Sequence, residues 1–169
     1  IFGGAAPSPR AALPVLPPLA LYIHIPWCVR KCPYCDFNSH TASPVLPEEE
    51  YVDAWLADLD QDLHAVYGRE LSSIFFGGGT PSLFSAEALG RLLKGVEQRI
   101  AFASDIEITL EANPGTFEQE KFVAYRALGI NRLSIGIQSF QGEKLKALGR
   151  IHNGDEAVRA AGMARQAGF

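Results

Sequence analysis

The sequence predicts an α/β protein in which four strands, each followed by a helix, form a parallel sheet. Two observations support this fold class. Short β-rich runs alternate four times with longer amphipathic segments, and glycine or proline punctuates the changes between them. The strands are also apolar on one face only, as described below. The four predicted strands cover residues 19–25, 72–76, 105–110 and 132–137.

The first strand is expected to end at Pro26, and the first helix to begin at Pro47. Proline suits the first turn of a helix, and the three glutamates that follow it favour the positive end of the helix dipole. Gly68 is expected to end this helix. Its apolar side chains recur at helical spacing, at Val52, Trp55, Leu56, Leu59, Leu63 and Val66.

Capping signals predict the later helices. Ser85 precedes a second helix, whose apolar stripe comprises Leu89, Leu92, Leu93, Val96 and Ile100. A capping box predicts a third helix that ends at Gly129, a short helix is expected near residues 143–148, and a second capping box predicts a last helix that ends at Gly168. The two boxes are Thr116 with Gln119 and Asn153 with Glu156.

Within the strands, apolar and polar residues alternate. Successive strand side chains point to opposite faces, so each strand has one apolar face and one polar face. In residues 105–110, for example, Ile106 and Ile108 oppose Glu107 and Thr109. The apolar face is expected under the helices, and the polar faces are expected to line a cavity inside a barrel-like sheet. An antiparallel sheet with one wet face is the alternative that gives the same pattern.

Composition places the chain among globular proteins, because 47% of its 169 residues are hydrophobic and 20% are charged. The net charge of −4 argues against nucleic acid as a main partner. No apolar run approaches the roughly 20 residues of a membrane span. Residues 1–18 contain five prolines, which predicts a disordered tail and no signal peptide.

Three cysteines lie within eight residues, just past the predicted first strand. Cys28, Cys32 and Cys35 form a CxxxCxxC motif. An odd, dense set of cysteines is a poor disulfide framework and a good metal site in a reducing compartment, which predicts a cytoplasmic protein. Sulfur ligands suit either zinc or an iron–sulfur cluster. Zinc usually takes four closed ligands, whereas three cysteines on a 4Fe-4S cluster leave one iron open to a small molecule.

The motif, with Tyr34 before its last cysteine, resembles the cluster motif of radical S-adenosylmethionine (radical SAM) enzymes. Four further blocks are similar to the oxygen-independent coproporphyrinogen III oxidase group, and within it to the haem chaperone branch. These blocks are residues 22–28, 77–82, 111–115 and 136–140. The resemblance implies a partial (β/α)6 barrel of the TIM type, of which this chain would supply the N-terminal four βα units.

The resemblance also implies site residues. Cys28, Cys32 and Cys35 would bind a 4Fe-4S cluster, whose open iron is chelated by S-adenosyl-L-methionine; no catalytic side chain is implied. Glycines permit close backbone approach, but a glycine run is more often a turn. Glu111 alternatively caps a helix or forms a salt bridge, and Arg150 alternatively is a solvated surface charge. The implied S-adenosylmethionine contacts are Tyr22, Tyr34, Gly78, Gly79, Thr80, Glu111, Gln138 and Arg150.

One departure separates the branches of this group. The oxidases carry a further cysteine two residues after the motif, where this chain has Phe37. Phe37 therefore favours a haem chaperone that delivers haem to respiratory haem proteins over an oxidase of porphyrin biosynthesis. The family's haem-binding histidine motif lies in a C-terminal region beyond residue 169, and the full-length protein is a candidate homodimer. His24 is expected to be a hydrogen-bonded core residue and His152 an exposed one.

The length bears on the domain organisation. A complete (β/α)8 barrel takes about 250 residues, so residues 19–169 are expected to be an incomplete radical SAM core that stops before a fifth strand. A parallel sheet cut at its fourth strand exposes an edge and an apolar surface. The segment alone is therefore expected to aggregate or to be marginally stable.

Overall fold

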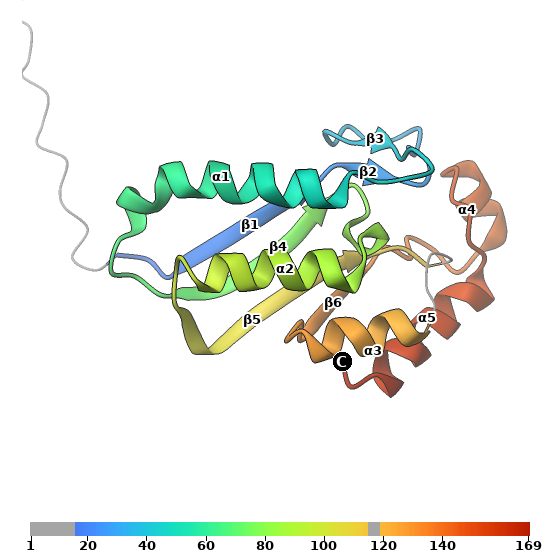
Figure 1. Cartoon of the computed structure of the whole chain (residues 1–169). Coiled ribbons are helices and arrows are strands. Elements are labelled where there is room, and N and C mark those ends of the chain that lie inside the picture. The colour runs from blue at the N-terminus through green and yellow to red at the C-terminus, as the bar shows by residue number, and fades with distance from the viewer. Residues whose placement is uncertain (1–15, 115–118) are drawn as a thin grey trace, which may run out of the picture.

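A computed structural model describes residues 16–114 and 119–169. It contains a four-stranded sheet in which every neighbouring pair is parallel and the strand order is β1-β4-β5-β6 (Figure 1). The parallel pairing confirms the predicted α/β class and excludes the antiparallel alternative. The four strands are β1 (Leu19–Ile25), β4 (Leu71–Gly78), β5 (Phe102–Ala112) and β6 (Arg132–Ile135).

Helices follow the strands as the capping signals predicted. The Ser85 side chain accepts a hydrogen bond from the Ala88 backbone N–H, and Asn153 with Glu156 forms a complete capping box. Gly68 and Gly129 have positive φ just after their helices end. The helices are α1 (Glu48–Val66), α2 (Ala86–Glu97), α3 (Gln119–Ala127), α4 (Gly142–Ala147) and α5 (Gly154–Gln166).

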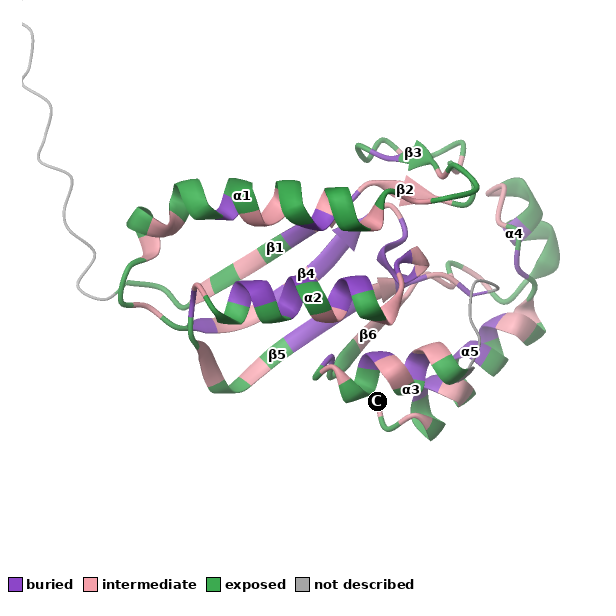
Figure 2. Ribbon diagram, viewed as in Figure 1, coloured by how far each residue is buried: buried purple, intermediate pink, exposed green. Residues whose placement is uncertain are grey.

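The core lies between the sheet and helices α1, α2 and α3, which run along one face of it (Figures 1 and 2). The apolar strand positions predicted to face the helices are buried or, at the strand ends and in β6, partly buried, and the stripe of α2 packs against them. Burial of this apolar surface is the main stabilising term of the domain. The largest fully buried side chains of the strands are Ile23, Ile25, Leu71, Ile74, Phe76 and Leu110.

The structure corrects several predicted bounds. Strand β5 is longer than predicted, because it pairs with β4 at one end and with β6 at the other. Strand β6 is shorter than predicted, because the Ile137 N–H bonds to the Ile135 carbonyl instead of continuing the ladder. Pro47 is the N-cap of α1 rather than part of its first turn. Thr116, predicted to cap α3, and the tail residues 1–15 lie outside the described residues.

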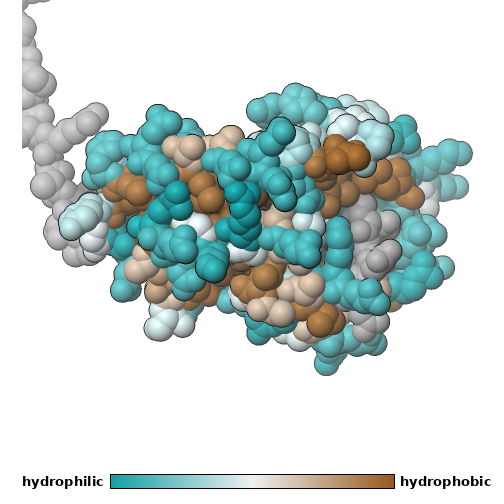
Figure 3. Space-filling view, viewed as in Figure 1, coloured by the Kyte–Doolittle hydropathy of each residue, from teal (hydrophilic) through white to brown (hydrophobic). Residues whose placement is uncertain are grey.

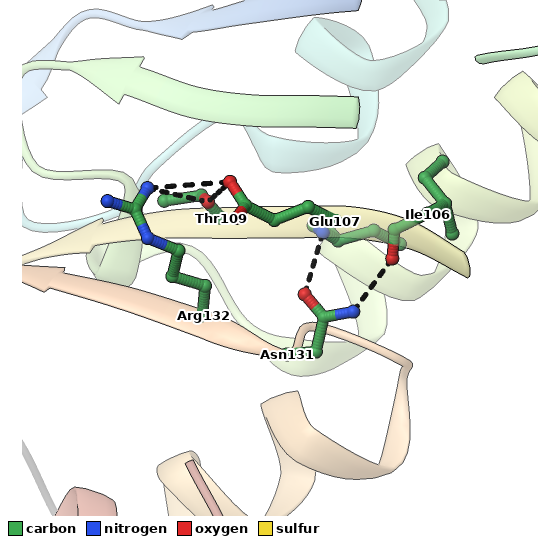
Figure 4. Close-up of polar contacts among 6 residues, drawn as sticks. Ile106, Glu107, Thr109, Asn131 and Arg132 are labelled. Atoms are coloured by element: carbon green, nitrogen blue, oxygen red, sulfur yellow. Dashed lines mark hydrogen bonds and ion pairs between the residues drawn. The ribbon is translucent and has the colours of Figure 1, made fainter. Parts of the chain in front are cut away.

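Asn131 ties β6 to the amino-terminal half of β5 (Figure 4). Its Nδ2 donates to the Ile106 carbonyl, and its Oδ1 accepts from the Ile108 N–H, each at 2.8 Å. Arg132 reaches across the same pair of strands to Thr109 and Glu107. These contacts fix the register of the edge strand far from the cysteines.

Hydrophilic side chains cover much of the helical face, and hydrophobic strips lie between them (Figure 3). Among the described residues, the structure has no helix both long enough and apolar enough to cross a membrane.

Replacing Phe76 tests the assignment of the core. This side chain of β4 is 0% exposed, so Phe76→Ala is expected to lower the free energy of unfolding by about 3–5 kcal/mol, through lost burial and the cavity that remains. Urea denaturation of the full-length protein measures the change. Tyr67→Ala is the control, because Tyr67 is 93% exposed, and a change within about 0.5 kcal/mol is expected there. Equal effects of the two substitutions would contradict the assignment.

Candidate functional site

The three cysteines lie on a loop that closes on itself at the carboxyl end of β1. Two short strands, β2 (Trp27–Cys28) and β3 (His40–Thr41), form its base. The His40 N–H donates to the Pro26 carbonyl, and the Ala42 N–H donates to the Cys28 carbonyl, each at 2.7 Å. All three thiols are free and half-buried. The loop is therefore held at both ends, with its sulfur atoms available.

Side chains also tie the loop together internally. The Lys31 ammonium donates to the carbonyls of Phe37 and Ser39, at 3.2 and 3.3 Å. The His24 Nε2–H donates to the Asn38 carbonyl at 2.8 Å, and its Nδ1 lies 3.1 Å from the Tyr22 hydroxyl. His24 is thus hydrogen-bonded, as predicted, but it is half-buried and attaches the loop to β1 instead of lying in the core.

The glycine run at the end of β4 lies directly against the base of the cysteine loop. The Gly79 N–H donates to the Ile25 carbonyl at 2.8 Å, and the Thr80 N–H donates to the Trp27 carbonyl at 2.7 Å. A Cβ atom on Gly79 would lie 2.5 Å from the Trp27 carbonyl oxygen, so a side chain there would push the two segments apart. Gly78 has a φ of 113°, which favours glycine.

A cleft of about 410 Å³ joins the cysteine loop to the ends of β4, β5 and β6, a size typical of small-molecule sites. The structure brings nine of the predicted site residues to this cleft. Thr80 is only 2% exposed and lines a smaller neighbouring hollow with Cys32 and Arg150. Tyr22 lines neither. The nine are Cys28, Cys32, Cys35, Tyr34, Gly78, Gly79, Glu111, Gln138 and Arg150.

Glu111 occupies the predicted place at the end of β5. Its Oε2 accepts a hydrogen bond from the Gly78 N–H at 3.2 Å. Burial raises the pKa of this carboxyl, and the Gly78 N–H and His24 partly oppose that rise. Glu111 forms no salt bridge among the described residues, which argues against the salt-bridge alternative.

Gln138 has an unusual backbone conformation. Its φ is 65°, the only positive φ of a non-glycine residue within residues 16–114 and 119–169. Such conformations cost free energy and are concentrated at functional sites. Tyr34 lines the same cleft, and partial burial and Cys32 raise its pKa. The Tyr34 phenol therefore stays protonated at neutral pH.

Arg150 is not the solvated charge that the sequence left open as an alternative. Its guanidinium donates to the Cys32 Sγ at 3.5 Å, and to Asn113 Oδ1 and the Gly136 carbonyl, each at 2.5 Å. Gly149, at a φ of 70°, lets the end of α4 approach Pro33 of the cysteine loop. This close approach brings the next residue, Arg150, to the lining of the cleft.

The expectation for His152 was wrong. The sequence predicted an exposed residue before a helix cap, but its side chain is 4% exposed. Its Nε2–H donates to the Ile137 carbonyl at 3.0 Å, and its Nδ1 is buried with no hydrogen-bond partner among the residues that the structure describes. Burial lowers the pKa of His152 below 6.5. The turn that ends β6 covers this ring, a contact that local sequence did not indicate.

The sequence interpretation did not place several residues that line the cleft among the site residues. Asn113 is the most informative, because its side chain contacts both Thr80 and Arg150. It follows Glu111 by two positions at the carboxyl end of a strand, and a polar residue there is the signal that could have identified it. The others are Arg30, Phe37, Ala112, Ser134, Ile135 and Gly136.

The donor set fits an iron–sulfur group better than a hard cation, because thiolates prefer soft metals. Three cysteines reach the same cleft from one loop. Within the described part of the chain, no three cysteine, histidine or acidic side chains are grouped closely enough to hold a single metal ion.

A parallel βα sheet with three cysteines and a glycine loop at its carboxyl edge is the arrangement expected of a radical SAM protein. Sequence comparison agrees with this class. Residues 22–169 match the radical SAM superfamily, and the chain belongs to this superfamily. The solved structure of coproporphyrinogen III oxidase (HemN) from Escherichia coli, described as a radical SAM enzyme, superposes with a TM-score of 0.82 at 32% identity, over 90% of this chain and 35% of that one.

Comparison with individual proteins gives a more specific similarity than the superfamily does. The chain is 59% identical over 154 residues to heme chaperone HemW of Escherichia coli strain K12, covering 91% of this chain and 41% of that protein. It is 56% identical over 161 residues to heme chaperone HemW of Haemophilus influenzae, covering 93% and 42%. The chain thus spans about two fifths of the length of these relatives.

Burial of neutral His152 predicts a pH dependence of stability. Its pKa is lower in the folded state than in the unfolded state, so the unfolded state binds more protons between the two values. Stability is therefore fully present above the unfolded pKa of about 6.5 and is lost as the pH falls through it, with a limiting slope of about 1.4 kcal/mol per pH unit.

Urea denaturation of the full-length protein between about pH 7.5 and about pH 5.5 measures this slope. The His152→Gln variant is expected to lose less stability over this range than the wild-type protein. His64→Gln is the control, because His64 is exposed on α1, and it should follow the wild-type slope. A His152→Gln slope equal to that of wild type would contradict the burial of a neutral ring.

Proposed function

We propose that this chain is the cofactor-binding part of a haem chaperone of the radical SAM family, which holds a 4Fe-4S cluster and S-adenosyl-L-methionine. The observation that carries the proposal is the shared cleft. Three cysteines of one loop, the glycine run of β4 and the ends of β5 and β6 all line it. Together these segments supply both a sulfur-ligand site and an adjoining polar pocket.

The cysteine loop suits a cluster with one open iron. Cys28, Cys32 and Cys35 would supply three thiolates, and no fourth cysteine exists in the sequence. The chain's contribution is a loop whose ends are fixed by backbone hydrogen bonds and whose interior is tied by Lys31. When bound, the cluster and S-adenosylmethionine supply one-electron cleavage of the sulfonium C–S bond.

The polar side of the cleft suits S-adenosylmethionine. Gly78 and Gly79 lack side chains, so a ligand can approach the backbone closely. The Glu111 carboxylate could bind an ammonium group or ribose hydroxyls, and the Gly78 N–H orients it for this. Gln138 and Arg150 add an amide and a guanidinium to the lining of the cleft, and the Thr80 N–H joins the glycine loop to the Trp27 carbonyl.

The rim of the cleft favours haem handling over porphyrinogen decarboxylation. Phe37 lines the cleft and is 58% exposed, in the place where the oxidases carry a further cysteine. Tyr34 lines the same cleft and is also exposed. Two exposed aromatic rings suit a flat apolar molecule such as haem. The relatives named heme chaperones support this reading; delivery to a respiratory haem protein, a cytoplasmic location and a homodimer belong to the same proposal.

An oxidase of porphyrin biosynthesis is the second candidate, because the superposition with coproporphyrinogen III oxidase covers 90% of the chain. Mixing the full-length protein anaerobically with coproporphyrinogen III, S-adenosylmethionine and a reductant separates the two. We expect no protoporphyrinogen, and we expect the same preparation to bind added haem with a change in its Soret absorbance. Formation of protoporphyrinogen, or no binding of haem, would overturn the chaperone proposal.

Cluster binding has its own test. Anaerobic reconstitution of the full-length protein with iron and sulfide is expected to give about four irons per chain and a cluster signal in absorbance and in EPR after reduction. Cys32→Ser is expected to abolish the bound iron and to leave the helix content measured by circular dichroism unchanged, because Cys32 lies outside the core.

Ser43→Ala is the control for this experiment, since the Ser43 hydroxyl bonds only to the nearby Val45 carbonyl and does not line the cleft. It should bind iron as the wild-type protein does. Full iron retention by the Cys32→Ser variant would refute the ligand assignment, and no redox-active cluster in the wild-type protein would refute both candidate functions.

A further inference from the structure

Arg150 lies where the cysteine loop meets the sheet. Its Nη1 donates to the Cys32 Sγ at 3.5 Å, while its Nη2 donates to Asn113 Oδ1 and to the Gly136 carbonyl, each at 2.5 Å. Its Nε is buried and has no hydrogen-bond partner. The guanidinium is therefore held in one orientation by the Nη contacts, although one of its donors is left unsatisfied.

Asn113 fixes that orientation. A guanidinium only donates hydrogen bonds, so the Asn113 oxygen must face Arg150 and its Nδ2 must face away. The Nδ2 donates to Thr80 Oγ1 at 2.8 Å, and the Thr80 N–H is bonded to the Trp27 carbonyl. A continuous chain of hydrogen bonds thus leads from the base of the cysteine loop through Thr80, Asn113 and Arg150 to Cys32.

The backbone beside this series of hydrogen bonds leaves space for the side chains that form it. A Cβ atom on Gly136 would lie 2.7 Å from Asn113 Oδ1 and 3.4 Å from the Arg150 Nη2. A side chain at this position would have to displace the Asn113 amide from its contact with the guanidinium. The contact is therefore a built feature of β5 and of the segment after β6, and not an incidental contact between surface side chains.

We propose that Asn113 is a positioning residue that holds Arg150 against Cys32 and thereby raises the reduction potential of the cluster. This inference rests on the proposed function, because it requires a cluster on Cys32. Reduction adds one negative charge to the cluster. A charge-assisted N–H···S bond stabilises the more negative state, and hydrogen bonds to the sulfur ligands are known to set cluster potentials.

Potentiometric titration monitored by EPR tests the inference on the reconstituted full-length protein. In Asn113→Ala the guanidinium keeps its charge and loses its anchor. The ratio of reduced to oxidised cluster at a fixed solution potential is expected to fall about tenfold, which corresponds to a midpoint lower by about 59 mV for a one-electron couple. Arg150→Gln is expected to lower the midpoint in the same direction.

The double variant Asn113→Ala with Arg150→Gln shows whether the amide acts through the guanidinium. If it does, the double variant has the midpoint of Arg150→Gln alone, because no positioned charge remains to be lost. Additive shifts, or an unchanged midpoint in Asn113→Ala, would overturn the inference. Asn113→Ser takes the place of the alanine variant if that variant binds no iron, with the same expected direction.

Asn131→Ala is the matched control. Asn131 also makes two hydrogen bonds that join β5 to the start of β6, but at the end of the sheet away from the cysteines (Figure 4). Its midpoint should equal that of the wild-type protein, and an equal shift in Asn131→Ala would mean that general loosening of β5 causes the effect. A wild-type protein that binds no cluster would refute the proposed function, whereas a bound cluster with an unshifted midpoint in Asn113→Ala refutes only this inference.

Discussion

The parallel pairing of β1, β4, β5 and β6 is the constraint on which the site depends. In register, Ile25 stands opposite Gly78, and Ala112 stands opposite Ile135. All four strands run in the same direction, so each delivers its next residues to the same edge of the sheet. The cysteines, the glycine run, Glu111 and Gln138 are far apart in the sequence and meet only because the strands end side by side.

Close backbone approach then turns that edge into a cleft. Gly79 lies against the Trp27 carbonyl, and Gly136 lies against the Asn113 amide, at distances that leave no space for a Cβ atom. The polar groups that meet there bond to one another, from Thr80 through Asn113 to Arg150. A site whose side chains already hold one another in place loses little conformational entropy when a ligand binds.

Local signals predicted the fold well, and they predicted the site in part. Strand alternation, the Ser85 cap and the Asn153 capping box are properties of neighbouring residues, so the sequence displays them directly. Arg150 and His152 were harder, since their burial depends on α4 and on the turn after β6, which local patterns do not place. The early end of β6 was not predicted either, because the local sequence did not show that the Ile137 N–H would bond to the Ile135 carbonyl and that Gln138 would then adopt a positive φ.

The acidic side chain of Glu111 and the basic side chain of Arg150 both line the cleft and do not pair with each other. Among the described residues neither Glu111 nor Arg150 forms an ion pair, although both line the same cleft. Glu111 accepts from a backbone N–H, and the oxygen acceptors of Arg150 are a neutral amide and a backbone carbonyl. Half-buried charges without a counter-charge cost free energy. On the proposed function, the amino and carboxylate groups of S-adenosylmethionine would offer each of them its complement, and the free-energy cost in the free protein would then contribute to affinity and orientation in the complex.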